Sequence, residues 1–183
     1  ARELALLEKI PDGITPWEDP DVAAVMALRQ DRAAALHIAR AYYQQKEFAA
    51  AQAVLGPMLK KFPGDERLHF EMGTVCHEQK KYQEAVQEFG RTIELMSDHV
   101  DAHYHLGHAH LKLENKVAAR ESFAAAVRLQ PTHAFARINL ADLLLEAGET
   151  KAAREQLEIA VKLVPQSPRA HELLKKTKRS SMP

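Results

Sequence analysis

The sequence predicts an all-α fold built from repeated helical hairpins. Its 183 residues include 30 Ala, 21 Leu and 17 Glu, which are strong helix formers, whereas only 6% are aromatic and seven are glycine. A β-sandwich or barrel would need more β-branched and aromatic residues and more turn glycines. The second observation is an internal repeat without gaps, in windows 32–65, 66–99, 100–133 and 134–167.

The first 31 residues do not fit this repeat. Residues 2–9 are expected to form a short helix, residues 11–20 a proline-containing connector, and residues 21–30 a helix that caps the first repeat. Residues 1–31 also carry seven acids against three bases. We therefore treat them as an N-terminal capping and linker segment.

Five columns of the four windows hold one kind of side chain each. In window order, the seventh column is Ile38, Met72, Leu106 and Leu140; the eighth is Ala39, Gly73, Gly107 and Ala141; the twentieth is Ala51, Ala85, Ala119 and Ala153; the twenty-fourth is Leu55, Phe89, Phe123 and Leu157; the thirty-second is Pro63, Ser97, Pro131 and Pro165. Apolar residues at helical spacing predict two helices per window, which approach each other at the small residues. The proline ends the second helix, because it cannot continue one.

These columns resemble the tetratricopeptide repeat, whose pattern combines an apolar-small pair, a small alanine, a large residue and a closing proline. The resemblance covers residues 32–167 and is clearest in window 100–133. It implies a right-handed superhelical solenoid of four hairpins. Residues 168–183 continue the register as a C-terminal capping helix and basic tail, with Ser167 as N-cap and Pro168 as the first helical residue.

One departure from the pattern lies in the second helix of the first repeat. Gly56 and Pro57 fall inside it. A proline there removes a hydrogen bond and clashes with the preceding turn, at a cost of roughly 3 kcal/mol. We expect a kink or break near residues 55–58.

The resemblance also implies a function. Family members hold a peptide segment of a partner on the concave surface, at the second, fifth, ninth, twelfth and thirteenth positions of each repeat. The candidate partner-binding residues are Leu36, Arg40, Tyr43, Arg67, Phe70, His77, Tyr104, His108, Phe135, Ile138 and Asp142. The fifth positions form an apolar stripe edged by Arg40 and Arg67, which would suit a peptide with hydrophobic anchors and an acidic residue. The positions of the family's carboxylate clamp hold Glu71 and Asp101 here, so no such clamp is expected.

A histidine-rich stretch at residues 99–110 raises the question of a metal site. Asp101, His105 and His108 stand at i, i+4 and i+7, on one helix face that could hold Zn²⁺ or Ni²⁺. The repeat register, however, places His103 and His110 between packed helices, where both should be largely buried. We therefore favour packing and groove-lining roles, and expect neither a metal nor another cofactor.

Other functional classes find little support. The sequence has no glycine-rich phosphate loop, no Gly-x-Ser-x-Gly elbow and no His-Glu-x-x-His, so no enzyme is expected. The single cysteine, Cys76, excludes an internal disulfide, and its core-facing position indicates an inert thiol. The basic residues of the tail have no aromatic residues between them, which argues against nucleic-acid binding. The longest apolar runs are far short of the ~20 residues that span a membrane, so no insertion is expected.

The sequence therefore predicts a protein-interaction scaffold or adaptor whose partner is another protein. The main alternative is self-assembly, as a homo-oligomer or as the scaffold arm of a larger assembly, and a third is a metal-binding module based on the histidine cluster. We expect a soluble protein and favour the cytoplasm over the periplasm.

Overall fold

The computed structural model describes residues 32–179, and every regular element within that range is an α-helix. The chain divides into two compact units, Ala1–Leu95 and Met96–Pro183, called the N-terminal and C-terminal units below. The helices and connector expected in residues 1–31 lie outside the described residues. None of the helices within 32–179 combines the length and apolar character needed to cross a lipid bilayer.

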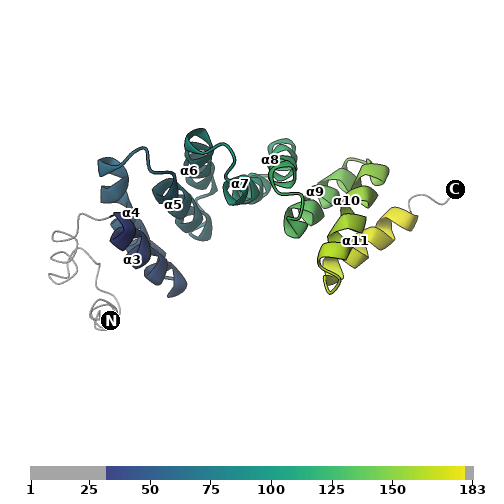
Figure 1. Cartoon of the computed structure of the whole chain (residues 1–183), viewed down its shortest axis with the longest axis horizontal. Coiled ribbons are helices and arrows are strands. Elements are labelled where there is room, and N and C mark those ends of the chain that lie inside the picture. Colours follow the sequence, from purple (N-terminus) through teal and green to yellow (C-terminus); the bar gives the residue numbers. More distant parts are fainter. Residues whose placement is uncertain (1–31, 180–183) are drawn as a thin grey trace. The chain divides into compact units, whose positions relative to one another are not determined.

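The described residues of the N-terminal unit form two helical hairpins. Its helices are α3 (Arg32–Gln44), α4 (Phe48–Lys61), α5 (Glu66–Glu78) and α6 (Tyr82–Leu95). They run from purple to teal in Figure 1. Helix α3 pairs with α4 and α5 with α6, and both α3 and α4 contact α5. The second hairpin therefore stacks on the first.

The C-terminal unit contains two further hairpins and one closing helix. They are α7 (Val100–Lys112) with α8 (Lys116–Leu129), α9 (Ala134–Glu146) with α10 (Thr150–Leu163), and α11 (Pro168–Arg179), which is yellow at its end in Figure 1. Helix α8 contacts α9, and α11 packs on both α9 and α10.

The core confirms the column pattern of the sequence. The alanines of the twentieth column and the large residues of the twenty-fourth column are fully buried, namely Ala51, Leu55, Ala85, Phe89, Ala119, Phe123, Ala153 and Leu157. Burying an apolar side chain of Leu or Phe size stabilises a fold by about 1.5–3 kcal/mol. These two columns therefore hold each hairpin together.

The same turn joins the two helices of every hairpin. The residue two positions before the second helix adopts a left-handed conformation in every case: φ is 63° at Lys46, 63° at Lys80, 59° at Glu114 and 78° at Gly148. Left-handed backbone favours glycine, because a β-carbon crowds the following carbonyl. Only the fourth repeat uses glycine at this turn position.

Of the kink or break predicted near residues 55–58, the break does not occur, because α4 runs without interruption from Phe48 to Lys61 with Pro57 inside it, and the kink stays a prediction. Val54 and Leu55 on one side of the proline and Met58 on the other are all buried. Burial on both sides of Pro57 favours a continuous helix, and the packing energy offsets the lost hydrogen bond.

The start of the closing helix agrees with the sequence. Helix α11 begins at Pro168, and the Ser167 hydroxyl oxygen accepts a hydrogen bond from the backbone N–H of Ala170 at 3.3 Å. Ala170, Leu173 and Thr177 face the core. The guanidinium of Arg154 on α10 donates to the carbonyl oxygen of Thr177 at 2.7 Å, which fixes the far end of α11.

Candidate functional site

The candidate partner-binding residues all lie on the first helix of a hairpin, and each unit has its own set. We call the set of the N-terminal unit its inner face: Leu36, Arg40 and Tyr43 on α3, and Arg67, Phe70 and His77 on α5. The inner face of the C-terminal unit consists of Tyr104 and His108 on α7, and Phe135, Ile138 and Asp142 on α9.

Most apolar side chains of the N-terminal inner face are already packed against other residues of the same unit. Leu36 is buried. Phe70 is half-buried, and its ring lies 5.9 Å from that of Phe89. The rings of Tyr43 and His77 meet aromatic neighbours edge-on. Little of the predicted apolar stripe is therefore left for a ligand in this unit.

The two arginines of the N-terminal inner face already have carboxylate partners. Arg40 Nη2 lies 2.5 Å from Glu71 Oε1, and Arg67 Nη2 lies 3.1 Å from Asp65 Oδ2. Asp65 also accepts from Arg32 at 3.0 Å. Burial works to raise the pKa of Asp65, but the hydrogen bonds from Arg67 and the nearby positive charges hold it below its usual value. Both arginines are therefore paired with carboxylates of their own unit, and an acidic ligand residue at this edge stays a prediction.

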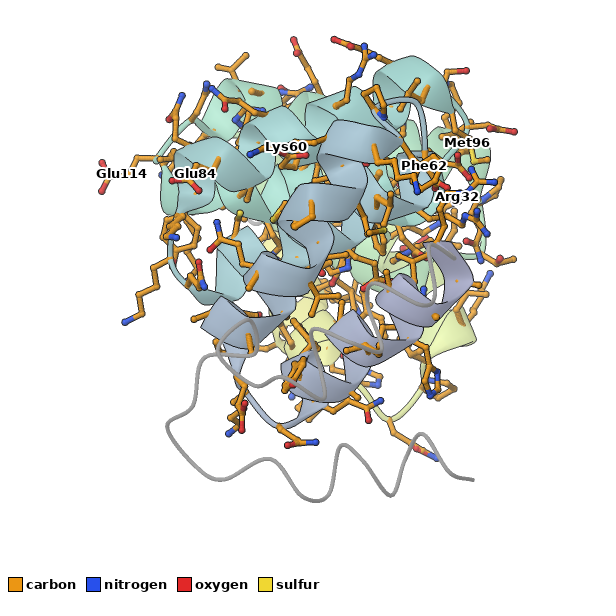
Figure 2. The ribbon with its side chains drawn as sticks, turned by 90° about the vertical axis from the view of Figure 1, so that its left-hand side faces the viewer. Arg32, Lys60, Phe62, Glu84, Met96 and Glu114 are labelled. Atoms are coloured by element: carbon orange, nitrogen blue, oxygen red, sulfur yellow. The ribbon has the colours of Figure 1, made fainter. Side chains whose placement is uncertain are left out.

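Arg32 has a second contact that fixes this end of the unit. Its guanidinium carbon lies 5.1 Å from the centre of the Phe62 ring, and Figure 2 shows the two side chains next to each other. A cation over an aromatic face is attracted by the ring quadrupole. The arginine thereby links the start of α3 to the residue that follows α4.

A hydrogen-bond network crosses the C-terminal inner face. Arg169 of α11 donates from Nη1 to Asn139 Oδ1 and from Nη2 to Asp142 Oδ2, both at 2.9 Å. Because the amide oxygen of Asn139 accepts from Arg169, its Nδ2 is the donor in the 3.1 Å contact with His108 Nε2. His108 Nε2 is therefore the acceptor in this contact.

Sequence reasoning missed both Asn139 and Arg169. Their signal was present in the register: Asn139 occupies the sixth position of its repeat, and Arg169 occupies the second position of the capping helix. The N-terminal unit shows a related pairing, in which ninth-position Arg40 meets sixth-position Glu71. In each unit a ninth-position side chain thus bonds to the sixth position of the next repeat.

Tyr104 lies at the centre of an aromatic cluster. Its ring centroid is 4.6 Å from that of His108, 4.7 Å from that of His133 and 5.9 Å from that of Phe123. Burial raises the pKa of Tyr104, while a hydrogen bond with Asn139 and the charge of Arg169 act in the opposite direction. The side chain is half-buried and remains a neutral phenol at physiological pH.

Phe135 is the most exposed aromatic side chain of the two inner faces, with 59% of its surface accessible. Ile138 and Asp142 follow at i+3 and i+7, on the same side of α9. Ile138 is buried, and Asp142 is held by Arg169. Phe135 is therefore the main apolar group that this face presents to solvent.

The histidines of residues 99–110 have separate structural roles. His99 is the N-cap of α7, where its Nδ1 accepts from the backbone N–H of Ala102 at 3.1 Å. His103 donates from Nε2 to the carbonyl of Ser97 at 3.0 Å. Within residues 32–179, no three His, Cys, Asp or Glu side chains are grouped so that they could bind a metal ion, and Asp101, His105 and His108 form no such group.

The contact of His103 recurs at the fourth position of each described repeat after the first, and in the capping helix. Each of these side chains bonds to the carbonyl oxygen six residues earlier, in the pairs His69–Pro63, His103–Ser97, Arg137–Pro131 and His171–Pro165. The fourth position thus supplies a donor that ties the incoming turn to the helix. His103 and His110 are both partly buried and neither is fully exposed, and the Nδ1 atom of His110 is buried.

Models of known families match most of this part of the chain. Tetratricopeptide repeat models match residues 117–177 and 100–133, a TPR repeat model matches residues 73–114, and the model of anaphase-promoting complex, cyclosome, subunit 3 matches residues 22–92. No curated protein sequence matches the chain significantly.

Solved structures show the same fold at low sequence identity. The crystal structure of the MamA protein is 20% identical, with a TM-score of 0.74 over 81% of each chain. YrrB, described as a TPR protein with an unusual peptide-binding site, is 19% identical, with a TM-score of 0.70 over 89% of this chain and 93% of its own. The first TPR of Spaghetti (RPAP3), bound to the HSP90 peptide SRMEEVD, is 18% identical, with a TM-score of 0.59 over 63% of this chain and 91% of its own. Together with the family models and the helical hairpins of both units, these matches show that the chain belongs to the tetratricopeptide repeat family.

Proposed function

We propose that this protein is an interaction scaffold that holds a peptide segment of a partner protein on the inner face of its C-terminal unit. The observation that carries the proposal is the exposure of Phe135 on α9, the helix whose Asn139 hydrogen-bonds the half-buried Tyr104. Aromatic side chains bury large apolar areas and are enriched among the residues that dominate binding energy. An exposed phenylalanine on a rigid helix is a suitable anchor point for an apolar side chain of a ligand.

The fold supports this use. Two structures of the same fold are described by their peptide binding, one with a bound HSP90 peptide and one with an unusual peptide-binding site. The network of Arg169, Asn139 and His108 holds the helices of the C-terminal unit in fixed register. A preformed face loses less conformational entropy on binding than a mobile one.

We propose no catalytic role. The tetratricopeptide fold is generally a protein-interaction module. The most nucleophilic side-chain type present, the thiol of Cys76, is buried, and its pKa is raised to about 11. A thiol of this kind is almost entirely protonated at neutral pH, and the thiolate is the reactive form.

A pair of substitutions tests the proposal. The whole chain serves as bait for partner capture from the native cell, alongside Phe135→Ser and the control Val117→Ser. Val117 is 72% exposed but lies on α8, a second helix, away from the inner face. We expect Phe135→Ser to lose the captured protein and Val117→Ser to retain it, with helical circular dichroism unchanged in both.

Equal capture by the two variants would place the binding surface elsewhere. Light scattering with multi-angle detection addresses the alternative of self-assembly. A molar mass that rises with concentration in the wild type and falls to that of a monomer in Phe135→Ser would show that the face binds a second copy of the chain.

A further inference from the structure

We infer that the C-terminal inner face recognises a basic side chain, an arginine or lysine, next to an apolar residue in an extended segment of the partner. The cation would lie against the ring of Tyr104 and near the carboxylate of Asp101, and the apolar residue against Phe135. The inference rests on the proposed function and specifies the chemistry of its ligand. It reverses the charge expected from the sequence, which pointed to an acidic ligand.

The C-terminal inner face carries a negative charge next to Tyr104. Asp101 is exposed on the first turn of α7, three residues before Tyr104 and therefore on the same side of the helix. Within residues 32–179 it has no hydrogen-bond or ion-pair partner. Asp98, just before the helix, is a second exposed carboxylate. The part of the face around Tyr104 thus has a negative charge that no side chain of the described region neutralises.

The bases near this face do not change that balance. Both Nη atoms of Arg169 bond within the unit, to Asn139 and Asp142. Lys116 is paired with Glu146, with its Nζ 2.8 Å from the carboxylate. Lys112 lies eleven residues along α7 from Asp101, about 16 Å away at the helical rise. An acidic ligand residue at Tyr104 would meet Asp101, and Arg169, whose charge reaches Tyr104, already bonds to Asp142.

The aromatic rings of Tyr104 and Phe135 are the second feature of this face that suits a cation next to an apolar residue. His133, two residues before Phe135, contacts the Tyr104 ring at 4.7 Å, and Asn139, one turn after Phe135, hydrogen-bonds Tyr104. The beginning of α9 therefore lies beside Tyr104, and Phe135 is exposed on that part of the helix. Cations within about 6 Å of a ring centroid are attracted to the negative face of the ring.

Arginine suits this arrangement particularly well. Its planar guanidinium stacks on aromatic faces and pairs with carboxylates through a fixed fork of donors. The exposed edge of Phe135 would take the adjacent apolar residue. The two ligand residues would thus be read by different groups, the cation by Asp101 and Tyr104 and the apolar side chain by Phe135.

The experiment selects peptides on the full chain from a random peptide library and measures the dissociation constant of a selected peptide by fluorescence anisotropy. We expect enrichment of Arg or Lys next to an apolar residue. Asp101→Asn should weaken binding by about fivefold, the range of an exposed ion pair. Asp101→Lys should weaken it more, by roughly tenfold or beyond, because it introduces like-charge repulsion. A peptide with the selected base replaced by Glu should bind Asp101→Lys better than it binds the wild type.

Two controls separate this inference from the proposed function. Glu155→Gln removes a charge from exposed α10, off the inner face, and should leave binding unchanged. If the selected peptides depend on Phe135 but lack a base, or if Asp101→Lys binds them as the wild type does, the inference is wrong and the proposed function stands. If no selected peptide depends on Phe135, both are overturned.

Discussion

Gly73 lies directly against the ring of Phe89. A β-carbon built at position 73 would come within 2.7 Å of the Phe89 Cδ1 and Cε1 atoms, closer than real β-carbons approach a neighbour. Gly107 has the same relationship with Phe123, also at 2.7 Å. The outer described repeats instead combine alanine with leucine, in the pairs Ala39–Leu55 and Ala141–Leu157. The eighth and twenty-fourth columns therefore exchange volume, so that each pair fills the same space.

The first prediction follows from this exchange. Gly73→Ala should lower the free energy of unfolding by about 1–3 kcal/mol, because the added methyl overpacks a closed core. Phe89→Leu alone leaves a cavity and should also be destabilising. The double variant reproduces the Ala–Leu pair of the outer repeats. Its free energy of unfolding, measured with denaturant, should fall by clearly less than the sum of the losses of the two single variants. Strict additivity would show that the two positions do not share a space.

The second prediction concerns the left-handed turn residues. Glu114→Gly should raise the free energy of unfolding by about 0.5–1 kcal/mol, because glycine adopts a φ of 59° without the steric cost of a β-carbon. Gly148→Ala is the matched reverse change and should cost about 1 kcal/mol. Thermal unfolding followed by circular dichroism measures both. A stabilising Gly148→Ala would contradict the assigned turn.

The third prediction concerns the histidine N-caps. His99 and His133 each accept a hydrogen bond from a backbone N–H through Nδ1 at 3.1 Å. Asp65 and Ser167, which stand just before α5 and α11, cap their helices in the same way through a side-chain oxygen. Replacing His99 by Ala should cost about 1 kcal/mol, whereas His99→Asp should keep the cap and the stability.

His133 provides the contrast to His99. Its ring also lies on Tyr104, so His133→Asp should preserve the cap but lose the aromatic contact. We expect His133→Asp to be less stable than the wild type by chemical denaturation, unlike His99→Asp. Equal stabilities for the two Asp variants would mean that the ring contact contributes nothing.

The fold was predictable from the sequence where packing repeats. Small residues at the eighth and twentieth columns and large ones at the twenty-fourth must recur if hairpins pack in the same way, so the helices and their core could be predicted from the alignment of windows. Pro57 does not cause the break that the same reasoning suggested. Its cost is local, whereas the buried residues that keep α4 continuous belong to the surrounding packing.

The site was predictable only in part. The register indicated which positions lie on the inner faces, but it could not show which charges remain unmatched. Arg40 pairs with Glu71 and Arg67 with Asp65 through side-chain conformations that the sequence does not specify. The histidines were harder still. The backbone groups that His99 and His103 bind exist only once the turn before α7 has formed.

The fourth prediction concerns His110, whose Nδ1 is buried without a hydrogen-bond partner. Burial lowers the pKa of His110 below its ordinary value of 6.5, an effect that Glu121 partly opposes. A histidine with a lowered pKa in the folded state contributes stability above pH 6.5, and that contribution is lost as the pH falls toward the folded-state value. Acidification should therefore destabilise the C-terminal unit partly through this side chain.

His110→Leu tests this, since the fourth repeat has Leu144 at the equivalent position. The substitution removes the unpaired nitrogen and should raise the free energy of unfolding by about 1 kcal/mol at neutral pH. It should also reduce the loss of stability between pH 6.5 and 5, measured by denaturant unfolding at each pH. If the free energy of unfolding of the variant falls as steeply between pH 6.5 and 5 as that of the wild type, other groups cause the loss.

The last prediction concerns Cys76. Burial, together with the negative charges of Glu84 and Glu88, raises the pKa of its thiol to about 11, and its Sγ lies 3.8 Å from a carboxylate oxygen of Glu84. At pH 8 the native protein should react with a disulfide reagent far more slowly than the denatured protein, in which the thiol is exposed with a pKa near 8.5.

The pH dependence of Cys76 has a definite sign. Because folding favours the protonated thiol, its contribution to stability is complete below the unfolded pKa and is lost as the pH rises from about 9 toward 11. Glu84→Gln removes one of the two negative charges and should lower the thiol pKa, so native Cys76 should react faster at pH 10 than in the wild type. The matched control Glu94→Gln removes an exposed charge near the end of the same helix, where Glu94 is paired with Arg91 rather than with the thiol. Equal rates in the Glu84 and Glu94 variants would mean that burial alone protects the thiol.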